Sequence, residues 1–451
     1  MSTLMVSISG IRGIVGDGLD PNVIVNFTSA YADFIGEGKV IIGRDARITG
    51  EMVNSIVKAT LNAKGIDVLD IGICPTPTVQ YTVKTLNAQG GIAISASHNP
   101  NEWNALKLLN STGQFMTPDE NTALLKILNL SENKFKSWDK IGKSYFYSDG
   151  IKRHLHDVLT MKHINKEEIK KRKFRVLADC VNGAGVYIIP ELLREFGCEI
   201  IEYNCEKTGI FPRLPEPVPE NLSATMNEVK KNNADFGIVV DPDVDRLVLI
   251  TEKGEPFGEE NTIAQAVKFI LSKEKGNVVV NLSTTLAVED IAKEYGCRLY
   301  RSPVGEANVV KKMKEVNAVI GGEGSGGVIY PALHYGRDAL IGIAITLQHL
   351  LEFGGTMDAL KNSLPSYFIS KKKIIIGKNN PDSIISLLIN KYGSEKINTD
   401  DGLRIDFSDH WVHFRKSNTE PIIRIIIEAA DKTKSGYLLD KYFGEIKQLL
   451  Q

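Results

Sequence analysis

The chain has 451 residues, of which 43% are apolar and 24% are charged, and its formal net charge is −1. This length exceeds one ordinary hydrophobic core, so the sequence predicts a soluble globular protein of three or four domains. The near-zero charge excludes a general electrostatic attraction to nucleic acid or to an anionic membrane, so any anion site must be a local cluster of Arg and Lys.

The N-terminus and the cysteines indicate the compartment. Residues 1–5 lack the basic and long apolar regions of a signal peptide, and no stretch approaches the ~20 apolar residues that span a bilayer. The five cysteines form no CxxC pair, and most stand in apolar, strand-like segments. Buried thiols of this kind are typical of a reducing compartment. We therefore expect a cytoplasmic protein.

A loose internal repeat occurs three times in the chain. Each copy reads as a strand, a polar loop, a helix, a glycine and a second strand, at residues 40–71, 175–203 and 277–301. This order is typical of a β-α-β unit whose helix ends at the glycine. The sequence therefore predicts three α/β domains of one topology.

The chain after Pro365 differs, because it is richer in alternating strand patterns and lacks the repeated unit. We place domain boundaries near Gly150, Lys253 and Pro365, with residues 152–165 as a helical lead into the second domain. The predicted fold class is α/β, with three similar mixed α/β domains and then a distinct, smaller α+β C-terminal domain. The predicted domains are 1–150, 151–253, 254–365 and 366–451.

A small apolar run at residues 91–94 reads as a buried strand that breaks into a polar turn, Ser95-Ala96-Ser97-His98-Asn99-Pro100. Pro100 pushes Asn99 away from helical geometry. The mouth of a strand is where α/β proteins place their chemistry, so Ser97 and His98 are candidate catalytic residues. The alternative is an ordinary turn in which the serine hydroxyl binds its own backbone.

Two cations of the first domain are further candidates. Arg12 lies between Gly10 and Gly13, and glycine permits a close approach of the backbone to a ligand. Lys107 follows the serine turn, and a lysine near clustered charges has a tunable pKa, but without a family resemblance Lys107 reads as a solvated surface lysine. A surface loop and a solvated lysine are the alternatives. Nearby Asp45 reads as structural, paired with a neighbouring arginine.

A second constellation is the acidic loop 241–246, which stands between two apolar strands and reads Asp241-Pro242-Asp243-Val244-Asp245-Arg246. Carboxylates at i, i+2 and i+4 can direct their oxygens to one hard cation, and without a cation they would repel one another. An EF-hand needs glycine at the sixth position, where this loop has Arg246. We therefore predict a metal site at Asp241, Asp243 and Asp245, with a solvated acidic turn as the alternative.

Two more polar loops stand in the last two domains. Glu323 and Ser325 lie in the glycine-rich loop 321–327 after a predicted strand, and a merely flexible loop is the alternative. In the C-terminal domain, hydroxyl, amide and backbone N–H groups beside cations suit a phosphate dianion, with a solvated positive loop as the alternative. This cradle comprises Arg415, Ser417, Asn418, Thr419 and, on the following strand, Arg424.

These four loops, in this order, resemble the signature loops of the α-D-phosphohexomutases, and the resemblance covers nearly the whole chain. It implies that the domains surround a central cleft and that Ser97 is phosphorylated. It implies one Mg²⁺ ion, held by the three aspartates and the phosphorylated Ser97. It also implies a small-molecule sugar phosphate as partner and a hexose 1,6-bisphosphate as activator.

The resemblance further implies roles for single residues. Lys107 corresponds to the family's general acid/base, and Arg12 corresponds to a phosphate or active-site contact. Glu323 and Ser325 would bind sugar hydroxyls, and the C-terminal cradle would bind the phosphate already on the substrate. His98 and Arg246 complete the candidate catalytic set. The sequence departs from the family pattern at Ala105, Pro242, Gly327 and Arg337.

We predict a phosphohexomutase that interconverts hexosamine 1-phosphate and 6-phosphate through a phosphoserine enzyme and a bisphosphorylated sugar. Glucosamine phosphate is the expected substrate, because Glu306 and the loss of a family histidine at Gly327 suit a 2-ammonium group. Galactosamine phosphate is a further candidate, since Gly327 leaves space. The alternatives are a phosphomannomutase/phosphoglucomutase, which Asn418 favours, a metal-dependent sugar phosphatase and a sugar-phosphate-binding protein. We expect no nucleic-acid or membrane partner, and a monomer or a homodimer.

Overall fold

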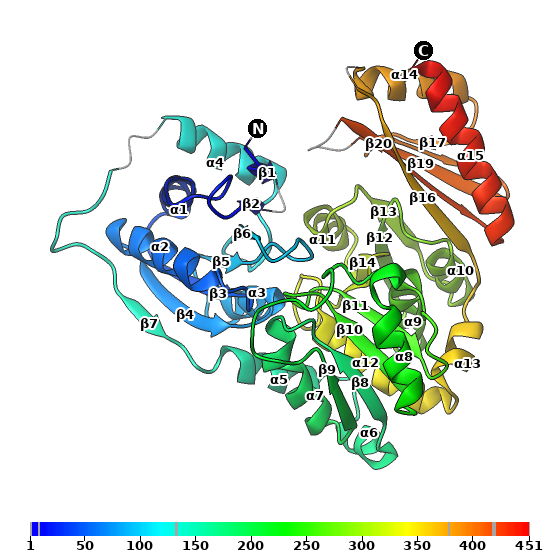
Figure 1. The fold of residues 1–451 in the computed structure, drawn as a ribbon, viewed down its shortest axis with the longest axis horizontal. Helices are drawn as coiled ribbons and strands as arrows, with labels where there is room; N and C mark the ends of the chain where they lie inside the picture. The colour runs from blue at the N-terminus through cyan, green and yellow to red at the C-terminus, as the bar shows by residue number, and fades with distance from the viewer. Residues whose placement is uncertain (1, 8–9, 131–133, 378, 417–420, 451) are drawn as a thin grey trace.

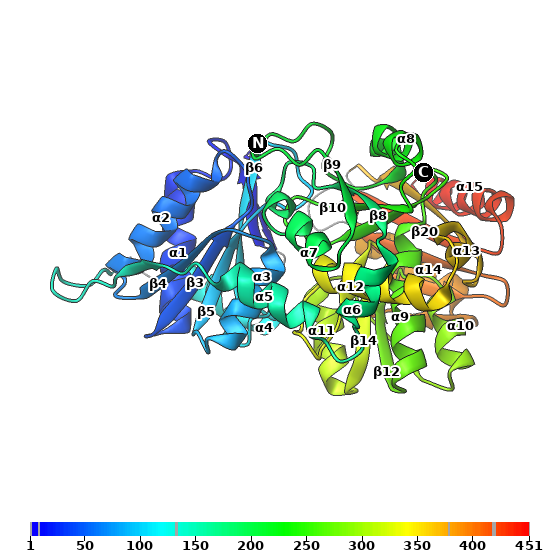
Figure 2. The same ribbon diagram turned by 90° about the horizontal axis from the view of Figure 1, so that it is seen from below.

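The strands form four sheets within the residues that the computed structural model describes, which are 2–7, 10–130, 134–377, 379–416 and 421–450. Figure 1 shows that the sheets follow one another along the chain, each with helices of its own. The second and third units are packed side by side in both views, and the first unit lies next to them (Figures 1 and 2). No helix within these ranges is long and apolar enough to cross a membrane.

The first unit contains the strands β1 Met5–Ser7, β2 Gly10–Ile14, β3 Lys39–Arg44, β4 Asp67–Ile73, β5 Gly90–Ile94, β6 Trp103–Leu109 and β7 Ser144–Phe146, and the helices α1 Pro21–Ile35, α2 Gly50–Ala63, α3 Thr76–Thr85 and α4 Pro118–Leu130. Its strand order is β1-β2-β6-β5-β3-β4-β7. Because alternate side chains of a strand face opposite sides, Val40 and Ile42 pack with α1, α2 and α4, while Ile41 packs with α3.

The second unit contains β8 Arg175–Asp179, β9 Glu199–Tyr203, β10 Phe236–Val240, β11 Leu247–Thr251, the helices α5 Gly150–Leu159, α6 Lys166–Arg172, α7 Ile189–Glu195 and α8 Ser223–Lys231, and the 3-10 helices η1 Ala184–Tyr187 and η2 Pro219–Asn221. The third contains β12 Asn277–Asn281, β13 Leu299–Ser302, β14 Ala318–Glu323, β15 Gly327–Ile329, α9 Glu259–Lys273, α10 Ala287–Glu294, α11 Glu306–Glu315, α12 Ala339–Phe353 and α13 Met357–Asn362. Their strand orders, β11-β10-β8-β9 and β13-β12-β14-β15, are the same in form. Ile238, Val278 and Ile341 belong to one continuous core that joins the two units.

The predicted repeat is present in all three units. The strand pairs β3–β4, β8–β9 and β12–β13 are each parallel and adjacent, with α2, α7 and α10 respectively between their strands in the chain. The α/β fold class is therefore confirmed. The predicted helical lead over residues 152–165 is wrong in extent, because α5 ends at Leu159. The Asn165 side chain then accepts a hydrogen bond from Glu168 N and caps a separate helix, α6.

The fourth unit contains β16 Phe368–Ile375, β17 Lys396–Asn398, β18 Leu403–Asp406, β19 His410–Lys416, β20 Ile422–Ala429, α14 Pro381–Tyr392 and α15 Lys432–Leu449. Its strand order is β16-β20-β19-β18-β17, and its neighbouring strands are antiparallel. The buried guanidinium of Arg404 donates to Leu282 O, and Leu286 N donates to Glu428 Oε2 at 2.8 Å. The fourth sheet is therefore docked on the third unit.

Candidate active site

Residues from all four units line one cleft of about 1250 Å³. A concave site of this size at a junction of domains is where small-molecule ligands bind most often. Strand ends supply much of its lining, since the serine turn follows β5 and the acidic loop follows β10. The cleft brings together the predicted residues Arg12, Ser97, His98, Lys107, Arg246, Glu323, Ser325, Arg415 and Arg424.

The serine turn holds Ser97 at the mouth of β5. Ser97 has a left-handed backbone, with φ of 49°, and its hydroxyl donates to Asp241 Oδ2 at 2.8 Å. The hydroxyl that binds the turn's own backbone is that of Ser95, which accepts from Ser97 N at 2.9 Å and donates to Asp45 Oδ2 at 2.7 Å. The ordinary-turn interpretation thus describes Ser95, and Ser97 is left to face the acidic loop.

A buried ion pair supports this turn from behind. Arg47 donates to Asp45 Oδ2 at 3.0 Å and to the carbonyl oxygens of Ser97 and Asn99, each at 2.7 Å. Burial raises the pKa of Asp45, and the adjacent Arg47 opposes that rise. The pairing of Asp45 with a neighbouring arginine is as predicted, and the structure shows that the pair fixes the carbonyls of the serine turn.

His98 is a neutral imidazole beside the serine. Its Nδ1 lies 3.3 Å from Ser97 Oγ. Burial lowers the pKa of His98 to about 2, and the nearby cations Arg246, Arg12 and Lys107 lower it further. Arg12 also donates to Asn99 Oδ1 at 3.3 Å, so the glycine-flanked loop and the serine turn are in contact.

The acidic loop presents three buried carboxylates to one point. The ligand oxygens of Asp241, Asp243 and Asp245 lie within 4.8 Å of one another, and each residue is at most 1% exposed. Asp241 Oδ1 accepts from the backbone N–H groups of Asp245 and Arg246. Strands β10 and β11 flank the loop, whereas helices flank the loop of an EF-hand, so the rejection of an EF-hand is confirmed.

These carboxylates fit a hard divalent cation. Asp243 Oδ1 and Asp245 Oδ1 are buried and make no hydrogen bond within the described residues. Burial raises the pKa of Asp241, and the charges of Asp245 and Asp243 raise it further. A cation among the three carboxylates would give the two unpaired oxygens a partner. It would also remove the repulsion between the three negative charges.

Three cations of the chain already contact the triad, and the weakest of these contacts is that of Arg246 Nε with Asp245 Oδ1 at 3.9 Å. Lys107 Nζ lies 2.5 Å from Asp243 Oδ2 and 3.9 Å from Asp245 Oδ2. Burial by itself would raise the pKa of Asp243, but Lys107 and the Thr76 hydroxyl reverse the effect and lower it. Arg337 Nη2 donates to Asp245 Oδ2 at 2.6 Å.

Arg337 also contacts the glycine-rich loop 321–327, which we call the sugar loop after its expected ligand. It donates to Glu323 Oε2 at 2.7 Å and to Glu306 Oε2 at 3.1 Å. A Cβ atom placed at Gly327 would lie 2.3 Å from Arg337 Cδ. The expectation that Gly327 leaves free space is therefore wrong, because the Arg337 side chain fills that space.

The two glutamates differ in their ionisation. Burial raises the pKa of Glu306 to about 7, and Arg337 only partly offsets this. Burial acts on Glu323 too, but Arg337 and Asn281 lower its pKa overall. Gln80 Nε2 donates to Glu306 Oε1 at 2.8 Å and so joins α3 of the first unit to the third.

The far end of the cleft carries the cations of the fourth sheet. Arg415 on β19 and Arg424 on β20 stand opposite each other in register. Arg415 Nε donates to Asp401 Oδ2 at 2.8 Å. Three residues of the predicted phosphate cradle, Ser417, Asn418 and Thr419, lie outside the described residues, as does Ser9 of the N-terminal loop.

Three family models match successive parts of the chain. The model of the phosphoglucomutase/phosphomannomutase alpha/beta/alpha domain I matches residues 5–134, that of domain II matches 152–254 and that of domain III matches 259–368. The chain belongs to the α-D-phosphohexomutase family. The predicted family is confirmed, and the chain is a phosphohexomutase, an isomerase.

The relatives of this phosphohexomutase carry two kinds of name. A "Probable phosphoglucosamine mutase" of Methanopyrus kandleri is 32% identical in an alignment of 447 residues that covers 98% of each chain. A "Phosphoglucomutase/phosphomannomutase" of Thermococcus kodakarensis is 36% identical in an alignment of 447 residues that covers 96% of each chain. A solved phosphoglucomutase/phosphomannomutase family protein of Burkholderia thailandensis is 24% identical, with a TM-score of 0.86, over 99% of this chain and 98% of that one. The last similarity shows a shared fold.

Three contacts of this phosphohexomutase site were not predicted. Thr76, Gln80 and Arg337 each reach an acidic residue of the site from a helix or from the loop before one. Thr76 carried a usable signal, because a Thr-Pro pair two residues after a strand marks the start of a helix. Arg337 was noticed only as a departure from the family pattern.

Proposed function

We propose that this phosphohexomutase interconverts hexosamine 1-phosphate and 6-phosphate, with glucosamine phosphate as the preferred substrate, through phosphorylated Ser97. Ser97 passes its phosphoryl group to the free hydroxyl of a bound sugar phosphate. The P–Oγ bond breaks, a P–O bond to the sugar forms, and the proton of that hydroxyl ends on Ser97 Oγ. We propose that the Lys107 ammonium relays it, by donating a proton to the leaving Oγ and taking up the proton of the hydroxyl. Transfer from the other end of the reoriented bisphosphorylated sugar returns the phosphoryl group to Ser97.

The observation that carries this proposal is the contact of Ser97 Oγ with the buried acidic triad. Asp241, Asp243 and Asp245 would hold one Mg²⁺, which supplies neutralisation of the charge on the transferring phosphoryl group. Ser97 is only 5% exposed, and Arg12, Arg246 and His98 line the cleft beside it, so little water reaches the serine. Exclusion of water favours transfer to a sugar over hydrolysis.

The far end of the cleft is proposed to hold the phosphate that does not react. Arg415 and Arg424 offer guanidinium groups there, and Ser417, Asn418 and Thr419 are the proposed partners in the same loop. A phosphatase has no need of a second anion site, so these arginines favour a mutase over the predicted phosphatase alternative. A hexose 1,6-bisphosphate, which can phosphorylate Ser97, is the proposed activator.

The preference for an amino sugar is supported by the charge of the sugar loop. Glu306 and Glu323 face one guanidinium, that of Arg337, so this part of the cleft has an excess of negative charge when Glu306 is ionised, and an ammonium ligand beside Glu306 favours that ionised form. A ligand ammonium compensates that excess, whereas a neutral hydroxyl does not. The argument from free space at Gly327 no longer holds, so it gives galactosamine phosphate no support. A phosphoglucomutase/phosphomannomutase remains the second candidate, because a relative 36% identical carries that name.

A substrate panel tests the proposal. We expect kcat/KM to be highest for glucosamine phosphate when glucosamine, galactosamine, mannose and glucose phosphates are compared under one condition. Glu306→Gln should reduce the ratio of glucosamine to glucose activity, while Glu315→Gln, at the exposed end of the same helix, should leave that ratio unchanged. A higher kcat/KM for mannose or glucose phosphate would overturn the proposal in favour of the second candidate.

A further inference from the structure

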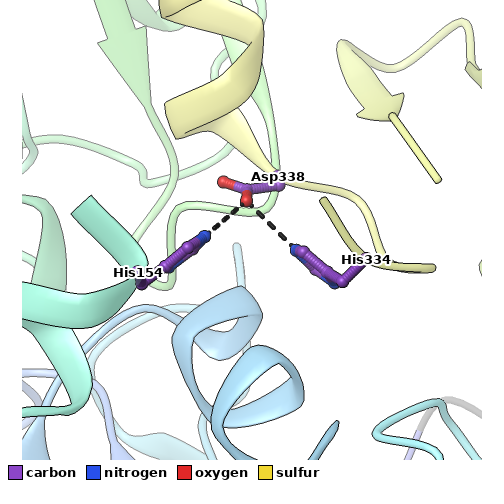
Figure 3. A group of neighbouring side chains, drawn as sticks. All are labelled: His154, His334 and Asp338. Atoms are coloured by element: carbon purple, nitrogen blue, oxygen red, sulfur yellow. Dashed lines mark hydrogen bonds and ion pairs between the residues drawn. The ribbon is translucent and has the colours of Figure 1, made fainter. Parts of the chain in front are cut away.

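A cluster of titratable side chains lies outside the proposed active site. His154 on α5 and His334, in the loop before α12, both direct Nε2 to Asp338 Oδ2, at 2.8 and 3.1 Å (Figure 3). Asp338 is the N-cap of α12. The three side chains are at most 3% exposed, and the proposed reaction uses none of them.

The three groups make a ligand set that suits a divalent transition metal. Two imidazole nitrogens and a carboxylate oxygen lie within 4.8 Å of one another. Bonds of about 2.0–2.2 Å in a tetrahedral zinc site place neighbouring ligand atoms about 3.3 Å apart. The two Nε2–Oδ2 distances are only a few tenths of an ångström shorter than that. Asp338 Oδ1 accepts from Leu340 N, so Oδ2 is the oxygen available to an ion.

The surroundings orient one of the rings for this role. The second nitrogen of His154, Nδ1, lies 2.9 Å from the Thr78 hydroxyl, and the ring stacks on Tyr81 with centroids 4.8 Å apart. Imidazoles that bind metals characteristically use the other nitrogen in such a hydrogen bond. Within the described residues Asp338 makes no ion pair with Lys or Arg, so its buried charge is balanced by a histidine proton or by an ion.

We propose that His154, His334 and Asp338 bind one Zn²⁺ ion, with a water as the fourth ligand. Both rings bind through the Nε2 lone pair and carry their proton on Nδ1, and His154 donates that proton to Thr78 Oγ1. The ion links α5 to the third unit and, through Thr78 on α3, to the first. Its nitrogen ligands distinguish this site from the acidic triad, whose three oxygen ligands suit Mg²⁺.

Cobalt binding by the full chain tests the proposal, with Co²⁺ as a coloured substitute for Zn²⁺. Excess Mg²⁺ is present throughout, so that the acidic triad does not take up the probe. We expect wild type to retain one equivalent of Co²⁺ with visible absorption bands, and His334→Gln to lose that equivalent. His156→Gln removes an exposed histidine two positions along α5 from His154 and should retain it.

Thr78→Val keeps all three ligands but removes the hydrogen bond to His154, and should weaken Co²⁺ binding about 10-fold to 100-fold. Wild type that retains no Co²⁺ in excess Mg²⁺ would overturn the proposal, as would full retention by a folded His334→Gln. X-ray absorption of zinc-loaded wild type decides the case if that variant does not fold. Two imidazoles around the zinc would support the site, and a shell of oxygen alone would refute it.

Discussion

The Ser97 hydroxyl donates a 2.8 Å hydrogen bond to Asp241 Oδ2, although the two residues are 144 positions apart in the chain. The contact joins the serine turn of the first unit to the acidic loop of the second. Both ends are fixed independently, Ser97 by the Arg47–Asp45 pair behind its turn and Asp241 by two backbone N–H groups. The proposed phosphoryl carrier and the candidate metal ligands are therefore in place before any sugar binds.

Ser97→Ala should abolish mutase activity and leave the fold intact, because the side chain lies on a turn and outside the hydrophobic cores. Intact-protein mass spectrometry should find a fraction of wild type heavier by one phosphoryl group and none of the variant. Ser95→Ala removes a hydroxyl that only supports the turn, so a phosphorylated fraction should persist there. Full activity of the Ser97 variant would refute the phosphoserine mechanism.

Asp243→Asn should sharply raise the Mg²⁺ concentration needed for half-maximal activity, because it removes one of three anionic ligands. The measurement is a Mg²⁺ titration of the initial rate. Asp235 lies at the opposite end of strand β10 from the acidic loop. Asp235→Asn should therefore need the same Mg²⁺ concentration for half-maximal activity as wild type. Wild-type activity that persists in excess chelator would show that the triad holds no essential metal.

Arg415→Ala should raise KM for the sugar phosphate with the Mg²⁺ requirement unchanged, because Arg415 is proposed to hold the phosphate that does not react. The loss of one charge-assisted contact corresponds to about 1.5–3 kcal/mol in kcat/KM. Lys416→Ala removes the exposed cation next along the strand and serves as the control. An equal effect of both variants would mean that the fourth sheet acts only through its general positive charge.

Lowering the pH from 7 to 5 should remove a stabilising contribution that buried, neutral His349 makes to the fold. Burial lowers the pKa of His349 to about 4, below the ~6.5 of an exposed histidine. The unfolded state therefore takes up the proton first, so this stability is present above pH 6.5 and is lost as the pH falls toward 4. Thermal unfolding of His349→Gln should show a smaller drop than wild type or the exposed control His156→Gln.

Much of the site was predictable because its residues follow predicted buried strands. Ser97, the three aspartates and Glu323 each stand at or just beyond a strand's carboxyl end, where an α/β protein collects its chemistry. Arg337 was not predictable, since nothing local shows that its side chain occupies the space beside Gly327. Glu306 was correctly placed near the sugar loop, but its pairing with Arg337 depends on long-range packing. The domain boundaries and the roles of the site residues stay predictions.

The docking of the fourth sheet on the third unit has a consequence for how the cleft closes. Arg404 and Glu428 fix that sheet to residues 282–286, and Lys371 reaches Glu259 at 2.6 Å. The third and fourth units should therefore move as one rigid body. The proposed site of the non-reacting phosphate should then move together with the sugar loop. The opposite side of the cleft carries Ser97. The first unit contacts the third through Gln80 with Glu306 and Lys84 with Leu333, and the second through Ser97 with Asp241 and Thr76 with Asp243. The distance between Ser97 and the sugar is thus set by how closely the two sides of the cleft approach each other.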